Sequence, residues 1–235
     1  MNAILVCLVA ALCTVQIADV RGDNLNVLKA QLAKAKQEVD NSVNRLTRAK
    51  NNLYYDLNTR LYNVKFPAME TINSIVNPAM EEIRSAGKAA NEGGKNADDC
   101  VESGRLALRE ISQTAFSSLD SCQSAALQLI VPVQNRMEAT ITDARKLTNE
   151  LDAIFLNCYS SNILEMQSCV AIALGKANTS IRSLKSTAEV VISSGTAESG
   201  SAFNGGAKCI RDVVSAARPK IPKALASAKE CISKV

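Results

Sequence analysis

The chain has 235 residues, a net charge of only +4, and neither histidine nor tryptophan. Without histidine there can be no Ser-His-Asp triad and no Cys-His pair. So small a charge, spread along the chain, does not indicate a nucleic-acid-binding surface. Aromatic residues make up 3%, whereas helix-forming residues such as Ala, Leu and Lys are plentiful. Carboxylate, lysine or tyrosine chemistry stays open, but no motif supports it. We therefore expect an all-α protein without enzymatic activity or a cofactor.

The N-terminus indicates secretion. Residues 3–15 form an apolar run that is followed by small and polar residues. This run is too short to cross a bilayer, which takes roughly 20 residues. The layout is typical of a signal peptide covering residues 1–22, with cleavage after Ala18 or Gly22. No later stretch is apolar enough for a membrane span, so we expect a secreted, extracellular product.

Residues 23–95 are expected to form an N-terminal helical region. Apolar side chains recur every three, four or seven positions over residues 25–64, which predicts one long amphipathic helix. Pro67 ends this stripe, because proline disfavours helix in the residue before it. A second, shorter helix, kinked at Pro78, should follow before a glycine-containing loop at 91–95.

Residues 96–235 are expected to form a disulfide-stapled antiparallel bundle of four helices. Breaks at Pro132, at the polar turn 160–162 and in the Ser/Gly-rich segment 193–206 separate four apolar stripes. The expected helices cover residues 100–130, 133–158, 166–191 and 207–232.

Six cysteines should remain after signal cleavage: Cys100, Cys122, Cys158, Cys169, Cys209 and Cys231. An even number in a secreted chain favours three disulfides. A zinc site is disfavoured, because the chain has no C-x-x-C pair and no histidine.

The spacing of these cysteines gives an expected connectivity. Bridged residues in an antiparallel hairpin lie about equally far from its turn, which assigns two pairs, and closure of the bundle assigns the third. The expected pairs are Cys100–Cys158, Cys122–Cys209 and Cys169–Cys231. The alternative is Cys158–Cys169, which requires a real turn at Ser160 because the two would be about 16 Å apart on one straight helix.

Shorter motifs each have a structural alternative. Asn178 begins the only N-glycosylation sequon, and it falls inside an expected helix, so modification depends on its exposure. Tyr54, Tyr55 and Tyr62 could form a contact patch, but packing at the end of the first helix is favoured. The carboxylates within 98–102 more often cap a helix than hold calcium, so no metal site is expected.

A pattern of cysteines in the second half of the chain carries a family resemblance. Cys158, Cys169, Cys209 and Cys231 lie in Ala/Ser-rich runs such as Ser168-Cys169-Val170-Ala171 and Ala207-Lys208-Cys209-Ile210. Together with the signal peptide, they resemble the secreted insect TsetseEP-type domain family from about residue 53 to the end. The Glu-Pro repeat tail of the protein that names the family is missing. The resemblance implies secretion into gut, saliva or haemolymph and no known catalytic residues.

We therefore expect a secreted, non-enzymatic interaction or structural protein that binds an unknown protein or surface partner through its helical surface. The alternative is a carrier that holds a lipid or another small apolar ligand between its helices. A carrier needs a cavity lined by large apolar side chains. The expected interior is instead rich in Ala and Ser, which suits close helix packing. The oligomeric state stays open.

Overall fold

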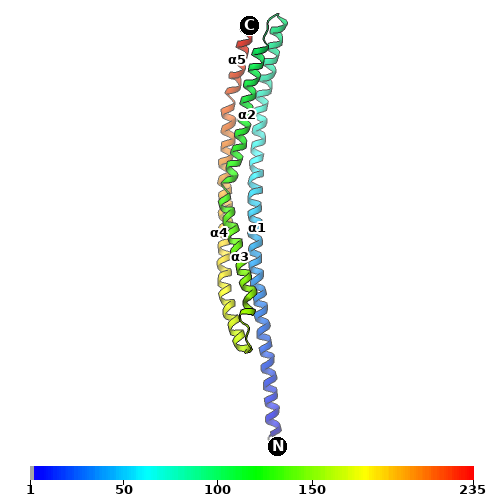
Figure 1. Ribbon diagram of the computed structural model, residues 1–235, viewed down its shortest axis with the longest axis vertical. Helices are drawn as coiled ribbons and strands as arrows, with labels where there is room; N and C mark the ends of the chain where they lie inside the picture. Colours follow the sequence, from blue (N-terminus) through cyan, green and yellow to red (C-terminus); the bar gives the residue numbers. More distant parts are fainter. Residues whose placement is uncertain (1–2) are drawn as a thin grey trace. The chain divides into compact units, whose positions relative to one another are not determined.

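The chain is all-helical over the residues that the structure describes (Figure 1). The computed structural model describes the backbone of residues 3–235 and the side chains of residues 24–235. Its helices are α1 (Ala3–Glu92), α2 (Asp98–Gln128), α3 (Val131–Asn157), α4 (Ile163–Ala217) and α5 (Lys220–Lys234). The expected all-α class is confirmed. The predicted signal peptide at 1–22 lies outside the described side chains.

Helix α1 continues through Pro67 and Pro78, where two separate helices were expected. A proline inside a helix deprives the carbonyl four residues earlier of its donor, here at Asn63 and Ser74. Both prolines and both of these residues are exposed, so water can replace the missing donor. The cost of each proline is thereby reduced, and the buried face of α1 is left intact.

Helix α4 also runs without a break through the Ser/Gly-rich segment 193–206, so the loop expected there is wrong. Among its glycines, Gly206 lies where helices approach closely. A Cβ added to Gly206 would lie 2.6 Å from Leu61 Cδ2 and 2.8 Å from Ala126 Cβ. Composition indicated a flexible loop, whereas the segment is helical and Gly206 serves helix packing.

The chain divides into two compact units, and each is described separately. Unit 1 comprises Met1–Asn51 and Val133–Ser194, and unit 2 comprises Asn52–Pro132 and Gly195–Val235. Helices α1 and α4 therefore contribute to both. The α1–α2 turn near residue 95 lies within unit 2, and Gly94 in this turn has the only positive φ, 82°, among the described residues.

The buried residues of unit 1 follow a seven-residue repeat, with alternating steps of four and three. On α3 they include Val133, Met137, Thr140, Ala144, Leu147, Leu151 and Ile154. On α4 they are Val170, Leu174, Ala177, Ile181, Leu184, Ala188 and Val191. On α1 they are Leu32, Ala35, Val39, Ser42 and Leu46. This period is that of a coiled coil with a left-handed supercoil.

The buried residues of unit 2 follow an eleven-residue repeat instead, with steps of four, four and three. On α2 they are Cys100, Gly104, Leu108, Ala115, Leu119, Cys122 and Ala126, with Ile111 half-buried between them. On α4 and α5 they are Ser199, Ala202, Gly206, Ile210, Ala217, Ile221, Ala228 and Ile232, and the same steps connect them when the half-buried Val213 and Ala224 are included. An eleven-residue period favours a right-handed supercoil, so the repeat changes where one unit gives way to the other.

Among the residues whose side chains are described, three disulfides are present: Cys100–Cys231, Cys122–Cys209 and Cys158–Cys169. The expected pair Cys122–Cys209 is confirmed. The expected pairs Cys100–Cys158 and Cys169–Cys231 are wrong. The expected hairpin at Pro132 does not exist, because only two residues separate α2 from α3 and Leu129 keeps helical dihedral angles. The turn at Ser160 is real, and its bridge is the pairing that we considered as the alternative.

The two disulfides of unit 2 have a common register. Cys100 and Cys122 lie 22 residues apart on α2, and Cys209 and Cys231 are separated by the same number. This separation is two lengths of the eleven-residue repeat, so both α2 cysteines return to one face of their helix. An antiparallel helical segment whose two cysteines have the same spacing can therefore form a disulfide with each of them.

Candidate functional site

The described residues contain no constellation for catalysis by a metal ion. No group of three or more Cys, Asp or Glu side chains among them could hold an ion. Within the same part of the chain, every buried polar side-chain atom has a hydrogen-bond partner. Of the carboxylates at 98–102, Glu102 forms an ion pair within its own helix. Arg105 donates to both carboxylate oxygens of Glu102, at 2.8 and 2.6 Å, and this lowers the pKa of that carboxyl.

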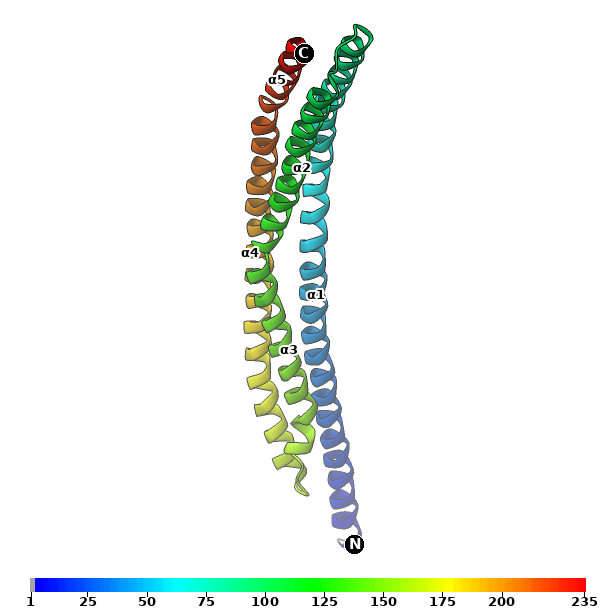
Figure 2. The same cartoon turned by 45° about the horizontal axis from the view of Figure 1, so that its top comes forward.

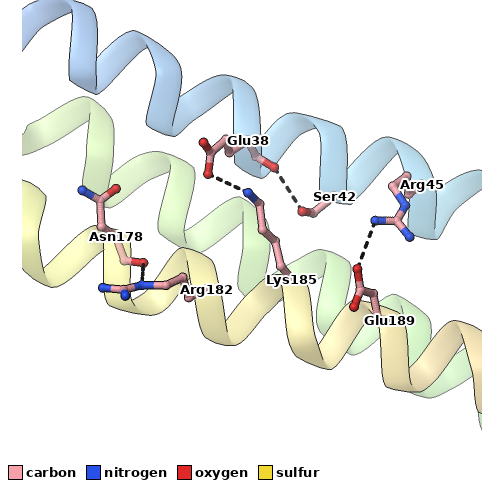
Figure 3. A network of polar contacts seen from close by, with 7 residues as sticks. All are labelled: Glu38, Ser42, Arg45, Asn178, Arg182, Lys185 and Glu189. Carbon is pink, nitrogen blue, oxygen red and sulfur yellow. Dashed lines mark hydrogen bonds and ion pairs between the residues drawn. The ribbon is translucent and has the colours of Figure 1, made fainter.

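Ion pairs connect the helical segments of unit 1 along their polar faces. Lys185 Nζ on α4 donates to Glu38 Oε2 on α1 at 2.7 Å, and Arg45 lies 3.7 Å from Glu189 (Figure 3). Two further pairs, Lys36–Asp152 and Lys50–Glu138, connect α1 to α3. Each pair is partly exposed, so each contributes little to stability. Their role is to favour one register of these segments.

We expect these pairs to make unit 1 sensitive to acid. Hydrogen bonds from Lys185 and Lys50 lower the pKa values of Glu38 and Glu138, respectively. A lowered pKa stabilises the fold above the unfolded value, about 4.3, and this stabilisation is lost as the pH falls through the folded value. We expect the melting temperature to fall below about pH 4.3. The fall should be smaller in Glu38→Gln/Glu138→Gln.

The control for this experiment is Glu150→Gln, which changes an exposed glutamate of α3 in the same unit. Its melting temperature should follow the pH as the wild type does. Circular dichroism melts between pH 7 and pH 3 measure the difference. If the double variant loses stability in acid as steeply as the control, the two ion pairs are not its origin.

Two clusters of large apolar side chains are exposed on the described surface. The first, the aromatic stripe, consists of Tyr54, Tyr55, Tyr62 and Phe66 on the part of α1 that belongs to unit 2. The second, the turn cluster, consists of Leu156, Tyr159, Ile163 and Leu164 around the α3–α4 turn of unit 1. Large contiguous apolar patches mark interaction sites in folded proteins, which makes both clusters candidates for such a site.

The aromatic stripe follows the helical period on the outer side of α1. Tyr55, Tyr62 and Phe66 are seven and four residues apart, so they share one face. Tyr62 and Phe66 stack, with ring centroids 6.0 Å apart. Tyr55 is 69% exposed. Packing at a helix end, which the sequence favoured for the tyrosines, is wrong because α1 continues to Glu92.

A cation–π contact connects α1 to α4 within unit 2. The guanidinium of Arg60 on α1 lies 4.0 Å from the ring centroid of Phe203 on α4, and both residues belong to unit 2. Such contacts restrain the two side chains that form them.

Asn178, the predicted glycosylation site, is exposed on α4 in unit 1. Its backbone carbonyl accepts a hydrogen bond from Arg182 Nε at 3.4 Å, and no such bond engages its side-chain amide in the view of Figure 3. The sequon is therefore at the surface, as modification requires.

Comparisons with known proteins add no relative: no family model, no curated protein and no solved structure matches the chain. In the part of the chain that the structure describes, no helix combines the length and apolar character that crossing a bilayer demands.

Sequence reasoning missed the turn cluster, although a signal for it was present. Leu156 and Leu164 are apolar, yet they fall outside the buried seven-residue repeat of α3 and α4. An apolar residue that does not fit the buried stripe of its own helix is a candidate for a contact with another molecule.

Proposed function

We propose that this chain is a secreted, non-enzymatic interaction protein of the TsetseEP type, which binds a protein partner through the aromatic stripe on α1. One observation carries the proposal: four of the chain's eight Phe and Tyr residues lie exposed within residues 54–66. Aromatic side chains are enriched at protein interfaces and among the residues that dominate binding energy.

The disulfides support secretion. Three bridges within one chain are expected in an oxidising compartment, and they are rare in the cytosol. The resemblance to the insect family adds gut, saliva or haemolymph as the fluid. Asn178 would then pass through the compartment where glycosylation occurs, and its exposure favours modification.

The alternative function, a carrier of an apolar ligand, has less support. Small residues bring the helices of unit 2 close together: a Cβ on Gly104 would lie 2.5 Å from Ala228 Cβ and 3.0 Å from Ile83 Cδ1. The larger grooves found on the described surface, of about 500 Å³, have polar residues among their lining. A carrier site is typically concave, enclosed and lined by apolar groups.

The test uses a photoreactive amino acid at single positions in the intact chain. We expect cross-linking to one partner from position 62, after mixing with the fluid into which the protein is secreted. Position 85, where exposed Ser85 lies elsewhere on α1 in the same unit, should give no such product.

Competition then separates specific from adventitious products. Unlabelled wild type should abolish the cross-link from position 62. A Tyr55→Ser/Tyr62→Ser/Phe66→Ser competitor should be weaker by more than about ten-fold, because truncating central aromatic residues removes most of an interface's affinity. Equal competition by the two proteins, or equal cross-linking from position 85, would overturn the proposal. Saturable displacement of a fluorescent fatty acid at one site per chain would favour the carrier.

A further inference from the structure

The turn cluster is an apolar, almost uncharged surface at one end of α3 and α4. Tyr159 is 81% exposed and Leu156 is 79% exposed, and Ile163 and Leu164 follow on the other side of the turn. Glu165 is the only charged residue within residues 153–172 of a chain in which charged residues make up 21%. Placing this surface in an apolar medium would therefore bury four apolar side chains and few charges.

The turn is held in one conformation. The Cys158–Cys169 disulfide closes it, with the Cα atoms 5.5 Å apart. The next residues provide hydrogen bonds for one another. Ser160 Oγ accepts from the backbone N–H of Asn162, and Asn162 Oδ1 accepts from that of Leu164, both at 3.1 Å.

Two further hydrogen bonds engage polar groups of the turn. Met166 N donates to the carbonyl of Asn162 at 3.1 Å, and Ser160 Oγ donates to Glu165 Oε2 at 3.1 Å. Glu165 lies in the first turn of α4, where the helix dipole favours a negative charge. Polar groups that are satisfied internally lower the cost of removing the turn from water, and this cost is decisive in a lipid environment.

We propose that the α3–α4 turn is a membrane-contact site that inserts the side chains of the turn cluster into the interfacial layer of a lipid bilayer. An exposed apolar surface can bind either a protein or a lipid bilayer, and the size of the cluster favours the bilayer. A stable protein interface buries about 800 Å² on each partner, from 20–30 residues. Four side chains on a narrow turn fall well short of this, whether the partner is another protein or a second copy of the chain.

A bilayer has no such minimum area, because each apolar side chain that enters it contributes independently. Tyrosine suits the boundary between head groups and acyl chains, since its ring is apolar and its hydroxyl is polar. The cluster carries no basic residue, so the contact requires no anionic lipid. The inference concerns unit 1 and is independent of the aromatic stripe in unit 2.

The chain has no tryptophan, so one introduced tryptophan is a unique reporter. The experiment uses Tyr159→Trp in the full secreted chain, titrated with vesicles of phosphatidylcholine alone. We expect a blue shift of the emission and quenching by brominated acyl chains. Salt at 1 M, where the Debye length is about 3 Å, should leave both unchanged. Tyr55→Trp, in the aromatic stripe, should show neither.

A second variant tests the apolar contribution. Adding Leu156→Ser/Leu164→Ser to Tyr159→Trp should weaken vesicle partitioning by at least about ten-fold, with the helical circular dichroism unchanged. An equal response of Tyr55→Trp, a response that requires anionic lipid and vanishes in salt, or partitioning unaffected by the two serines would each overturn the proposal. A blue shift that grows with protein concentration without vesicles would assign the cluster to self-association instead.

Discussion

A chain without the Cys122–Cys209 disulfide is expected to lose about 4 kcal/mol of unfolding free energy. The bridge joins residues 87 positions apart, so its removal as Cys122→Ala/Cys209→Ala frees a long loop in the unfolded chain. Urea denaturation measures the loss. Hydrogen exchange should place it in unit 2, with faster exchange in α2 and α5 and little change in α3.

The matched comparison is Cys158→Ala/Cys169→Ala. These cysteines are only 11 positions apart, so their bridge should contribute less, about 3 kcal/mol. The loss should also appear in unit 1 rather than in unit 2. A larger effect from the short bridge would show that strain or packing, rather than loop closure, determines how these disulfides stabilise the protein.

The second large effect is expected at Gly206, with Gly205 beside it as the control. Gly206→Ala should lower the unfolding free energy by about 1–3 kcal/mol. The added Cβ would meet Ala126 Cβ at 2.8 Å, and that atom can move only with the backbone of α2. The Leu61 methyl at 2.6 Å can rotate away at a smaller cost.

Gly205→Ala makes the same chemical change one position earlier, where no atom lies within 4 Å of the added Cβ. It should raise the unfolding free energy by about 0.5–1 kcal/mol, because alanine favours helix. We therefore expect urea denaturation to show changes in unfolding free energy of opposite sign for these two adjacent glycines. If both substitutions stabilise the chain, α4 does not pack closely at Gly206. If neither has an effect, segment 193–206 is not a rigid helix.

The sequence predicted the helical class, the interruption next to Pro132 and the turn at Ser160, because apolar periodicity and turn residues are local signals. The disulfide pairing instead depends on how distant parts of the chain come together, which is not a local signal. Cys100 with Cys231 and Cys122 with Cys209 are each centred between residues 165 and 166, and Cys158 with Cys169 is centred close by. The nearly palindromic spacing thus indicated a single reversal of the chain. We instead assumed a reversal at every break.

The two incorrect helix boundaries have a common cause. Pro67, Pro78 and the glycines of 193–206 were judged by their individual preferences, which are weak compared with tertiary packing. Prolines on the exposed side leave the buried face of α1 unchanged, and Gly206 allows the helices to approach. Whether the helix continues through these residues depends on which face of the helix they occupy. Composition alone does not contain this information.

The candidate surfaces were predictable to different degrees. The tyrosines of the aromatic stripe were noticed as a possible contact, but their exposure could not be known while α1 was expected to end beside them. The turn cluster is visible only after the buried repeats of α3 and α4 are known, since Leu156 and Leu164 stand out by not fitting them.

The nested disulfides determine what a protease could release. A single cut anywhere between Cys100 and Cys231 leaves both pieces in one covalent molecule, because the outer bridge still joins them. Residues 24–92 of α1 contain no cysteine, and the turn that follows at 93–96 is exposed. One cut in that turn would convert α1, with its aromatic stripe, into a separate peptide held only by packing. Such a nicked molecule would come apart on dilution or in denaturant without any reducing agent.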